Sequence, residues 1–357
     1  MSIALSELLE VYGEGNLLAF GGAAIGLFFG FFAQRSKFCL RAAVIDFWHG
    51  HFKDKLSIWL LAFSAAVIGT QALVLWGLLD SNGARQIAAR GSLSGAMIGG
   101  LLFGVGMILT RGCASRLLIL SANGNLRALL SGLIFAVAAQ SSLSGALMPA
   151  RIAISELSTI EGGPGRDLLA LIGTGHMTGL VLGFLSLFLA VYFGSRSVTK
   201  PVGLWIGGIG TGLSVAMAWG FTQWVAHNSF EPIQIQGLTF SGPSAEWLMR
   251  VLQSPAPKIG FEFGLLPGVF VGSFVGALVG KEFKLEGFKD GYSMRRYIAG
   301  AILMGFGSML AGGCAIGAGV TGGAIFALTA WVTLLGMWVG AGLTDRWLDS
   351  PANVRLP

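Results

Sequence analysis

Residues 99–114 read GGLLFGVGMILTRGCA and residues 300–315 read GAILMGFGSMLAGGCA, so the chain contains one stretch twice. Aligned without a gap, the copies agree at eight of sixteen positions, where shared composition alone would give roughly two. Each copy reads as an apolar helix with small residues two or three apart, ending in Gly-Cys. Small residues let helix backbones approach closely in lipid, and the Gly before each Cys is expected to let the chain turn. The repeat therefore predicts two related membrane hairpins.

The composition places the chain in a membrane. Of its 357 residues, 54% are hydrophobic and 11% are charged, and the mean hydropathy is +0.74. A soluble fold of this size would carry roughly twice that charged fraction. The net charge of +6 would suggest nucleic acid in a soluble chain, but no stretch resembles a nucleic-acid-binding module. We therefore expect lipid as a partner, and no nucleic acid.

Apolar runs of the length needed to span a bilayer, about twenty residues, occur nine times. They fall at 16–34, 58–79, 93–110, 128–149, 168–193, 201–221, 264–280, 297–311 and 324–343.

Three connections between these spans are basic, at 49–57, 195–200 and 281–296. All three fall on one side, which the positive-inside rule makes cytoplasmic. This predicts an outer N-terminus and a cytoplasmic C-terminus. Residues 1–15 carry acidic side chains and no positive stretch, so we do not expect a cleaved signal peptide there.

With this topology the two copies of the repeat run in opposite directions. We therefore expect an all-α integral membrane protein of about nine transmembrane helices in two inverted repeats, each with a re-entrant half-helix after its Gly-Cys turn. Residues 315–324, for example, are too few to cross and too apolar for a solvated loop. The predicted organisation is a first repeat at 1–150, a linker helix at 151–200 and a second repeat at 201–357. The last contains an extracytoplasmic segment at 223–261, for which a plain surface loop is the alternative.

The cysteines are three in number and far apart, at Cys39, Cys113 and Cys314. That spacing disfavours a disulfide framework, a zinc site and a dithiol redox centre. We expect no cofactor and no metal. The thiols remain as lone groups, either packed as small hydrophobic side chains or placed to meet a solute.

The duplicated pattern G-x-G-x-x-L-x-x-G-C-A, together with residues 34–39 (QRSKFC), resembles the YeeE/YedE family of sulfur transporters, whose characterised members import thiosulfate. The second turn, residues 312–317 (GGCAIG), has the form usual in that family, whereas the first, residues 111–116 (RGCASR), carries arginine at both flanks. The resemblance implies a transporter in the bacterial inner membrane, with a periplasmic N-terminus. It also implies delivery to a cytoplasmic sulfur-carrier protein related to TusA.

A thiol at a helix N-terminus beside arginine lies in a positive potential that attracts anions. Its S–H can meet a terminal sulfur atom, while backbone N–H groups and arginine hold oxyanion oxygens. The basic residues near Cys39 have an alternative role as positive-inside anchors. The predicted substrate path comprises Cys39, Cys113, Cys314, Gly112, Gly313, Arg111, Arg116, Gly312 and Arg41.

Two other functions remain open from the sequence. One is a membrane sulfurtransferase, in which a cysteine attacks a sulfane sulfur and holds it as a persulfide. The other is a channel for an unrelated small solute, with the cysteines as packing. The arginines of the first turn also leave open a sulfur or selenium species other than thiosulfate.

Overall fold

The computed structural model describes residues 13–196, 202–229, 231–252, 254, 259–287 and 291–348. The prediction that residues 1–15 are not a cleaved signal peptide concerns mostly residues 1–12, which lie outside the described part.

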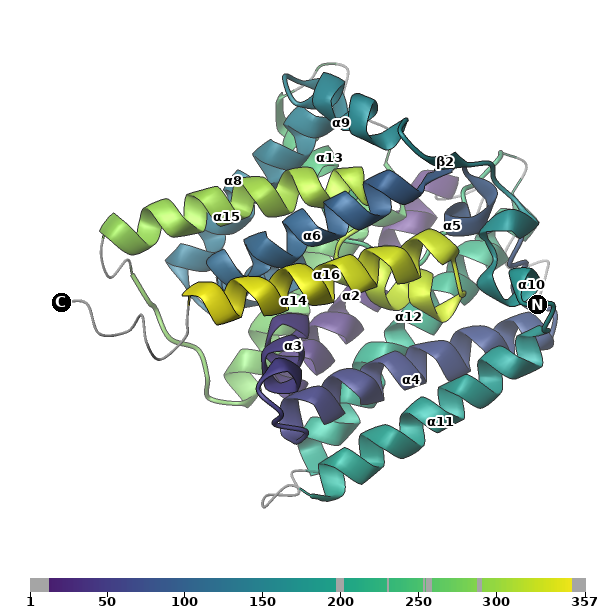
Figure 1. The fold of residues 1–357 in the computed structure, drawn as a ribbon, viewed down its shortest axis with the longest axis horizontal. Coiled ribbons are helices and arrows are strands. Elements are labelled where there is room, and N and C mark those ends of the chain that lie inside the picture. Colours follow the sequence, from purple (N-terminus) through teal and green to yellow (C-terminus); the bar gives the residue numbers. More distant parts are fainter. Residues whose placement is uncertain are drawn as a thin grey trace.

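Within the described residues, each of the nine predicted spans corresponds to one long helix (Figure 1). These helices are α2 (Glu14–Ser36), α4 (Asp54–Leu75), α6 (Leu93–Leu109), α8 (Leu126–Ser144), α11 (His176–Ser195), α12 (Val202–Asn228), α14 (Phe261–Val279), α15 (Gly291–Leu310) and α16 (Leu328–Leu348).

Short elements connect the long helices. They are α3 (Leu40–Trp48), α5 (Arg85–Ala88), α7 (Ala114–Ala122), α9 (Met148–Ser155), η1 (Pro164–Arg166), α10 (Leu168–Leu171), α13 (Ser241–Leu252) and the π-helical η2 (Ala315–Gly322). Two two-residue strands, β1 (Gly91–Ser92) and β2 (Thr159–Ile160), pair antiparallel.

In the described part of the chain, eight helical segments are long and apolar enough to cross a membrane. The ninth predicted span is α16, which has 21 residues. Its last turn contains two charged residues, Asp345 and Arg346. At 1.5 Å per residue its length of about 30 Å still matches the hydrocarbon core of a bilayer. The chain is therefore an all-α, multi-pass membrane protein.

Two predicted spans have different boundaries from those expected. The run at 168–193 is interrupted, because α10 ends in a turn with Gly173 at φ 73° and α11 begins only at His176. The His176 ring Nδ1 lies 3.0 Å from Gln71 Oε1 on α4, so this histidine makes a polar contact between helices. The run at 128–149 ends as a helix at Ser144, and Pro149 then lies in the first turn of α9.

The two copies of the repeat pack directly on each other as α6 and α15. A Cβ on Gly99 would lie 2.6 Å from Gly307 O, and one on Gly106 would lie 2.5 Å from Gly300 O. These pairings mean that the helices cross antiparallel, with backbone against backbone. Figure 1 shows α15, α6 and α16 side by side, as their contacts require.

Gly106→Ala should destabilise this crossing, because the added Cβ meets carbonyl and amide atoms that cannot move aside. Overpacking of this kind costs about 1–3 kcal/mol, so we expect a lower thermal unfolding temperature in detergent. Gly132→Ala on α8 is the matched control, since nothing lies within 4 Å of its Cβ position. Equal unfolding temperatures for the two variants would contradict the packing.

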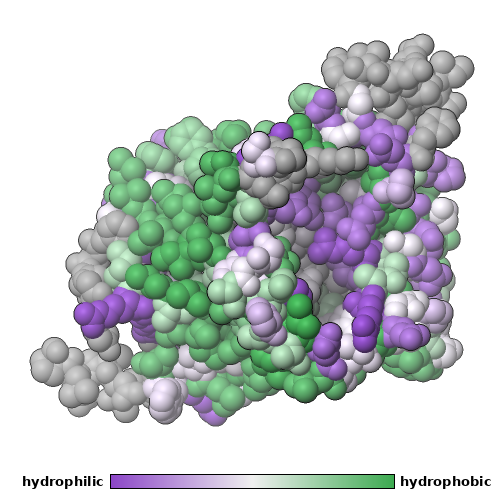
Figure 2. Space-filling view, turned by 90° about the horizontal axis from the view of Figure 1, so that it is seen from above, coloured by the Kyte–Doolittle hydropathy of each residue, from purple (hydrophilic) through white to green (hydrophobic). Residues whose placement is uncertain are grey.

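The remaining long helices pack in pairs around this crossing. α2 contacts α14 and α12, α4 contacts α12 and α11, and α8 contacts α15. Figure 2 shows a broad hydrophobic surface on one side of the molecule and hydrophilic side chains gathered toward the right, where Figure 1 places α5 and β2.

The predicted extracytoplasmic segment at 223–261 lies partly inside the protein. Leu238 and Phe240 are buried, and the Thr321 hydroxyl of η2 donates to Leu238 O at 2.7 Å. A plain surface loop is therefore wrong for this part of the segment. The predicted helical stretch within it is α13.

Candidate functional site

All three cysteines occupy the same local position, immediately before a short helix. Cys39 precedes α3, Cys113 precedes α7 and Cys314 precedes η2. The Cys314 Sγ accepts a long hydrogen bond, 3.5 Å, from Gly317 N in the first turn of η2. The Cys113 Sγ lies 3.4 Å from Ser115 Oγ. The Cys113 and Cys314 thiols thus lie beside the free N–H groups at the start of a helix, whereas Cys39, within the described residues, makes no side-chain cap hydrogen bond.

The chain reverses two residues before each cysteine, not one. Lys37, Arg111 and Gly312 have φ of 55°, 59° and 77°, in the left-handed region. The prediction that Gly112 and Gly313 make the turns is wrong, because neither has positive φ. A non-glycine residue in this conformation costs about 1 kcal/mol, which Gly312 avoids and Arg111 does not.

Gly313 instead allows close packing, since a Cβ there would lie 2.8 Å from Ala318 N. A Cβ on Gly112 would meet only ordinary contacts, the nearest at 3.5 Å. The two copies therefore differ in how closely other atoms pack around the glycine before the cysteine.

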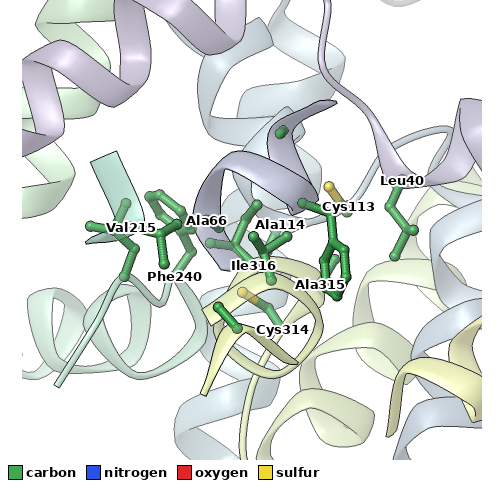
Figure 3. Close-up of a cluster of buried hydrophobic side chains, with 14 of the residues drawn as sticks. Leu40, Ala66, Cys113, Ala114, Val215, Phe240, Cys314, Ala315 and Ile316 are labelled. Atoms are coloured by element: carbon green, nitrogen blue, oxygen red, sulfur yellow. The ribbon is translucent and has the colours of Figure 1, made fainter. Parts of the chain in front are cut away.

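Cys113 and Cys314 come together in one buried cluster (Figure 3). Each is 1% exposed, and Ala114, Ala315 and Ile316 lie beside them in the same cluster. Cys39 is partly exposed, and its neighbours Phe38 and Leu40 belong to that cluster. The Cys113 thiol lies near enough to those of Cys39 and Cys314 to interact with both electrostatically. The fold thus gathers three distant cysteines.

The predicted basic residues lie around the end of the site nearest Cys39. Arg116 Nη1 contacts Gln34 Oε1 at 3.5 Å, and Gln34 Nε2 donates to Glu282 Oε2 at 2.7 Å. Lys37 Nζ completes the group with an ion pair of 3.0 Å to Glu282 Oε1. The Arg116 side chain is therefore engaged by α2.

The other two predicted arginines differ in exposure. Arg111 is exposed at the turn after α6, and Arg41 is partly buried on α3. We call Lys37, Arg41, Arg111 and Arg116, which flank Cys39 and Cys113 along the chain, the basic rim.

A separate cavity opens at the C-terminal end of α15. We call it the outer cavity, and it has two adjoining parts of about 390 and 160 Å³. Both parts are lined by Arg90, Arg166, Ala311, Gly312 and Thr329. Arg151 and the carboxylate Glu156 line the larger part, and Arg85 and Ala318 line the smaller. Four arginines thus surround a hollow that reaches the turn leading to Cys314.

Arg166 is the most deeply buried of these arginines, at 6% exposure. Its guanidinium donates to Ala89 O and, at 2.7 Å, to the Thr329 hydroxyl. Its Nε has no hydrogen-bond partner among the described residues. Burial lowers the pKa of Arg166, because a desolvated cation is disfavoured. A bound anion would relieve that penalty and take the spare N–H.

The sequence did not single out the outer cavity. Its arginines come from the connections at 80–92 and 147–167, and they carry no motif. Tertiary contacts such as the pairing of β1 with β2 and the docking of Arg166 on Thr329 bring them to the end of α15. Among the described residues, no group of three or more His, Cys, Asp or Glu could hold a metal ion.

These features define a multi-pass membrane protein with a cationic cavity and a buried group of thiols. Residues 35–343 match the family described as sulphur transport. The chain belongs to this family, and the resemblance seen in its sequence is confirmed.

Two curated relatives align with nearly the whole chain. A thiosulfate transporter, TsuA, from Spirochaeta thermophila is 28% identical over 345 residues, covering 91% of this chain and 98% of the relative. A thiosulfate transporter, TsuA, from Escherichia coli K12 is 24% identical over 349 residues, covering 92% and 93%.

Proposed function

We propose that this protein is a permease that imports a small sulfur-containing anion, thiosulfate or a close relative, along a central path lined by its three cysteines. One observation carries the proposal. The cationic outer cavity ends at Gly312, two residues before Cys314, and Cys314 shares a buried cluster with Cys113. The names of the two relatives support thiosulfate as the anion.

The path begins in the outer cavity, where Arg166 and Arg90 bind the anion's oxygens through charge-assisted hydrogen bonds. The anion then passes the Gly312 turn to Cys314. There the thiol donates to the terminal sulfur, and N–H groups at the start of η2 take the oxygens. Cys113 with α7 offers the same pair of groups again, and Cys39 is the last thiol. Successive weak sites of this kind allow an ion both to enter and to leave.

The described state is closed at the cysteines. Cys113 and Cys314 are each 1% exposed, so no anion can reach both without movement of the surrounding core. Passage requires α7 and η2 to separate, with the chain flexing at the turns before them. The left-handed Gly312 is well suited to this movement, because glycine crosses between backbone regions at little steric cost.

The inverted-repeat organisation belongs to this proposal, with residues 1–150 and 201–357 as repeats and 151–200 as the linker. Its support is the pattern of contacts. Exchanging α2 with α12, α4 with α14, α6 with α15 and α8 with α16 maps each cross-repeat contact onto another, as α2–α14 maps onto α12–α4. Gly99–Gly307 and Gly106–Gly300 are exchanged in the same way. Such repeats commonly place the substrate between them near the midplane, where α7 and η2 would be re-entrant.

In this arrangement the outer cavity faces the periplasm and the basic rim near Cys39 faces the cytoplasm of a bacterial inner membrane. The positive-inside rule supports this orientation. The exposed Arg111 would then be available to an acidic face of a TusA-like sulfur-carrier protein receiving the anion.

Uptake of ³⁵S-thiosulfate into vesicles containing the purified protein tests the proposal. We expect time-dependent accumulation that excess unlabelled thiosulfate blocks and equimolar chloride does not. Protein-free vesicles supply the background. Intact-mass analysis of the protein after uptake addresses the sulfurtransferase alternative. An added sulfur atom on a cysteine would identify a persulfide and sink the permease, as would uptake no greater than background.

A further inference from the structure

Two carboxyl side chains meet beside the outer cavity. Glu262 in the first turn of α14 is 8% exposed, and the Glu246 carboxyl on α13 lies close to it. Two ionised carboxylates this close, one of them buried, repel each other, which favours a state in which the pair holds one proton. Glu246 itself is exposed, which gives the buried partner a route for exchanging that proton with water.

Arg85 links this carboxyl pair to the outer cavity. Its Nη1 lies 3.5 Å from Glu262 Oε1 and 3.3 Å from Gln236 Oε1, and its side chain also lines the smaller part of the cavity. Arg250 on α13 also lies in this region, and its guanidinium stacks 4.8 Å above the Phe263 ring. Glu246 and Arg85 are the charged groups that act on Glu262 electrostatically.

The charge on the carboxyl pair therefore sets how strongly Arg85 is neutralised. With one proton shared, the pair carries a single negative charge. Without that proton it carries two, which hold Arg85 and repel an anion from the cavity. In that same cavity, Arg166 has a buried Nε with no hydrogen-bond partner among the described residues, which indicates room for an acceptor from outside the chain.

We infer that Glu246 and Glu262 form a proton-binding site that makes anion binding in the outer cavity proton-linked. This inference rests on the proposed function and names its regulation. One proton from the outer solution binds the carboxyl pair as one anion binds beside Arg85 and Arg166. Because the linkage is reciprocal, anion binding must in turn draw a proton onto the pair.

Isothermal titration of the full-length protein in detergent with sodium thiosulfate, from pH 5.5 to 8.5, tests the inference. Thiosulfate remains a dianion over this range, so any change in affinity belongs to the protein. We expect roughly tenfold weaker binding at pH 8.5 than at pH 5.5, within the usual range of coupling between sites. A pH-indicator dye in weak buffer should report proton uptake when thiosulfate is added.

Glu262→Gln should remove both the pH dependence and the proton uptake, and hold the affinity near its acidic value. The amide keeps a hydrogen-bond donor for Glu246 and cannot ionise. Glu246→Gln, at an exposed position, should act in the same way and serves if the buried variant fails to fold. Glu161→Gln is the control, since this carboxylate is exposed and lies outside the residues that line the cavity; it should behave as the wild type.

The outcomes separate the two proposals. Pure wild-type protein that binds thiosulfate equally from pH 5.5 to 8.5 overturns the proton linkage and leaves the permease intact. The proton linkage is also overturned, with the permease intact, if Glu262→Gln and Glu246→Gln keep the wild-type pH dependence of thiosulfate binding. A wild-type protein that binds no thiosulfate at any of these values overturns the proposed function, and with it the inference.

Discussion

Cys113→Ser is expected to reduce thiosulfate uptake into vesicles by about 10- to 100-fold, the loss that follows when a buried hydrogen-bonding partner is exchanged for a poorer one. The side chain sits at the start of α7 and is 1% exposed, in one cluster with Cys314. A hydroxyl replaces a soft, polarisable donor with a hard one, and so fits the terminal sulfur of thiosulfate less well. Cys314→Ser should show a loss of similar size, because it occupies the equivalent position before η2. Initial rates of ³⁵S-thiosulfate uptake measure both.

Met107→Leu is the matched control for these variants. Met107 is fully buried in the same cluster, and the exchange conserves volume without touching a thiol. Its uptake should stay close to that of the wild type, and thermal unfolding should show that all three variants fold. Wild-type rates in both serine variants would mean that the thiols serve only as packing, and the cysteine path would then be abandoned.

The hydrophobic pattern alone predicts most of the fold. Membrane helices satisfy their own backbone hydrogen bonds, so each apolar run long enough to span became a helix. The errors occur where backbone conformation overrides hydrophobicity, as at Gly173, which separates α10 from α11. The turns before Cys113 and Cys314 were assigned to the wrong residue for a similar reason. Sequence points to the glycines as the flexible positions, but the left-handed residue of the first turn is Arg111.

The cysteine cluster and the outer cavity differ in how well the sequence predicts them. The cysteines could be found because duplication marks two of them at equivalent positions. The outer cavity could not, since it depends on contacts between segments that share no motif. Arg166 looks like any charge on an outer connection until η1 docks beside α16 and the Thr329 hydroxyl receives one of its N–H groups. Local patterns thus predict the elements and their repeats, whereas a site assembled from connections requires the tertiary structure.

Arg166→Gln should raise the KM for thiosulfate uptake by about a hundredfold, since removing one partner of a buried charge pair typically costs 2–5 kcal/mol. Arg166 is buried at the base of the outer cavity, and its Nε is free of any partner among the described residues. The amide is neutral and shorter, and it cannot supply the guanidinium's several N–H groups to one anion. Arg166→Lys should recover part of the loss, because it restores the charge without the planar arrangement of donors. The dependence of the initial uptake rate on thiosulfate concentration gives the KM of the wild type and of both variants.

Arg196→Gln is the matched control, since it removes an arginine that stacks on Tyr192 at the end of α11 and leaves the outer cavity unchanged. Arg166 also ties the connection before β1 to α16, so a purely structural role has to be separated from anion binding. Thiosulfate should raise the thermal unfolding temperature of the wild type and of Arg196→Gln, but much less that of Arg166→Gln, because only ligand bound to the folded state stabilises it. If Arg166→Gln unfolds at a lower temperature yet is stabilised by thiosulfate as strongly as the wild type, the guanidinium holds the connection and does not bind the anion.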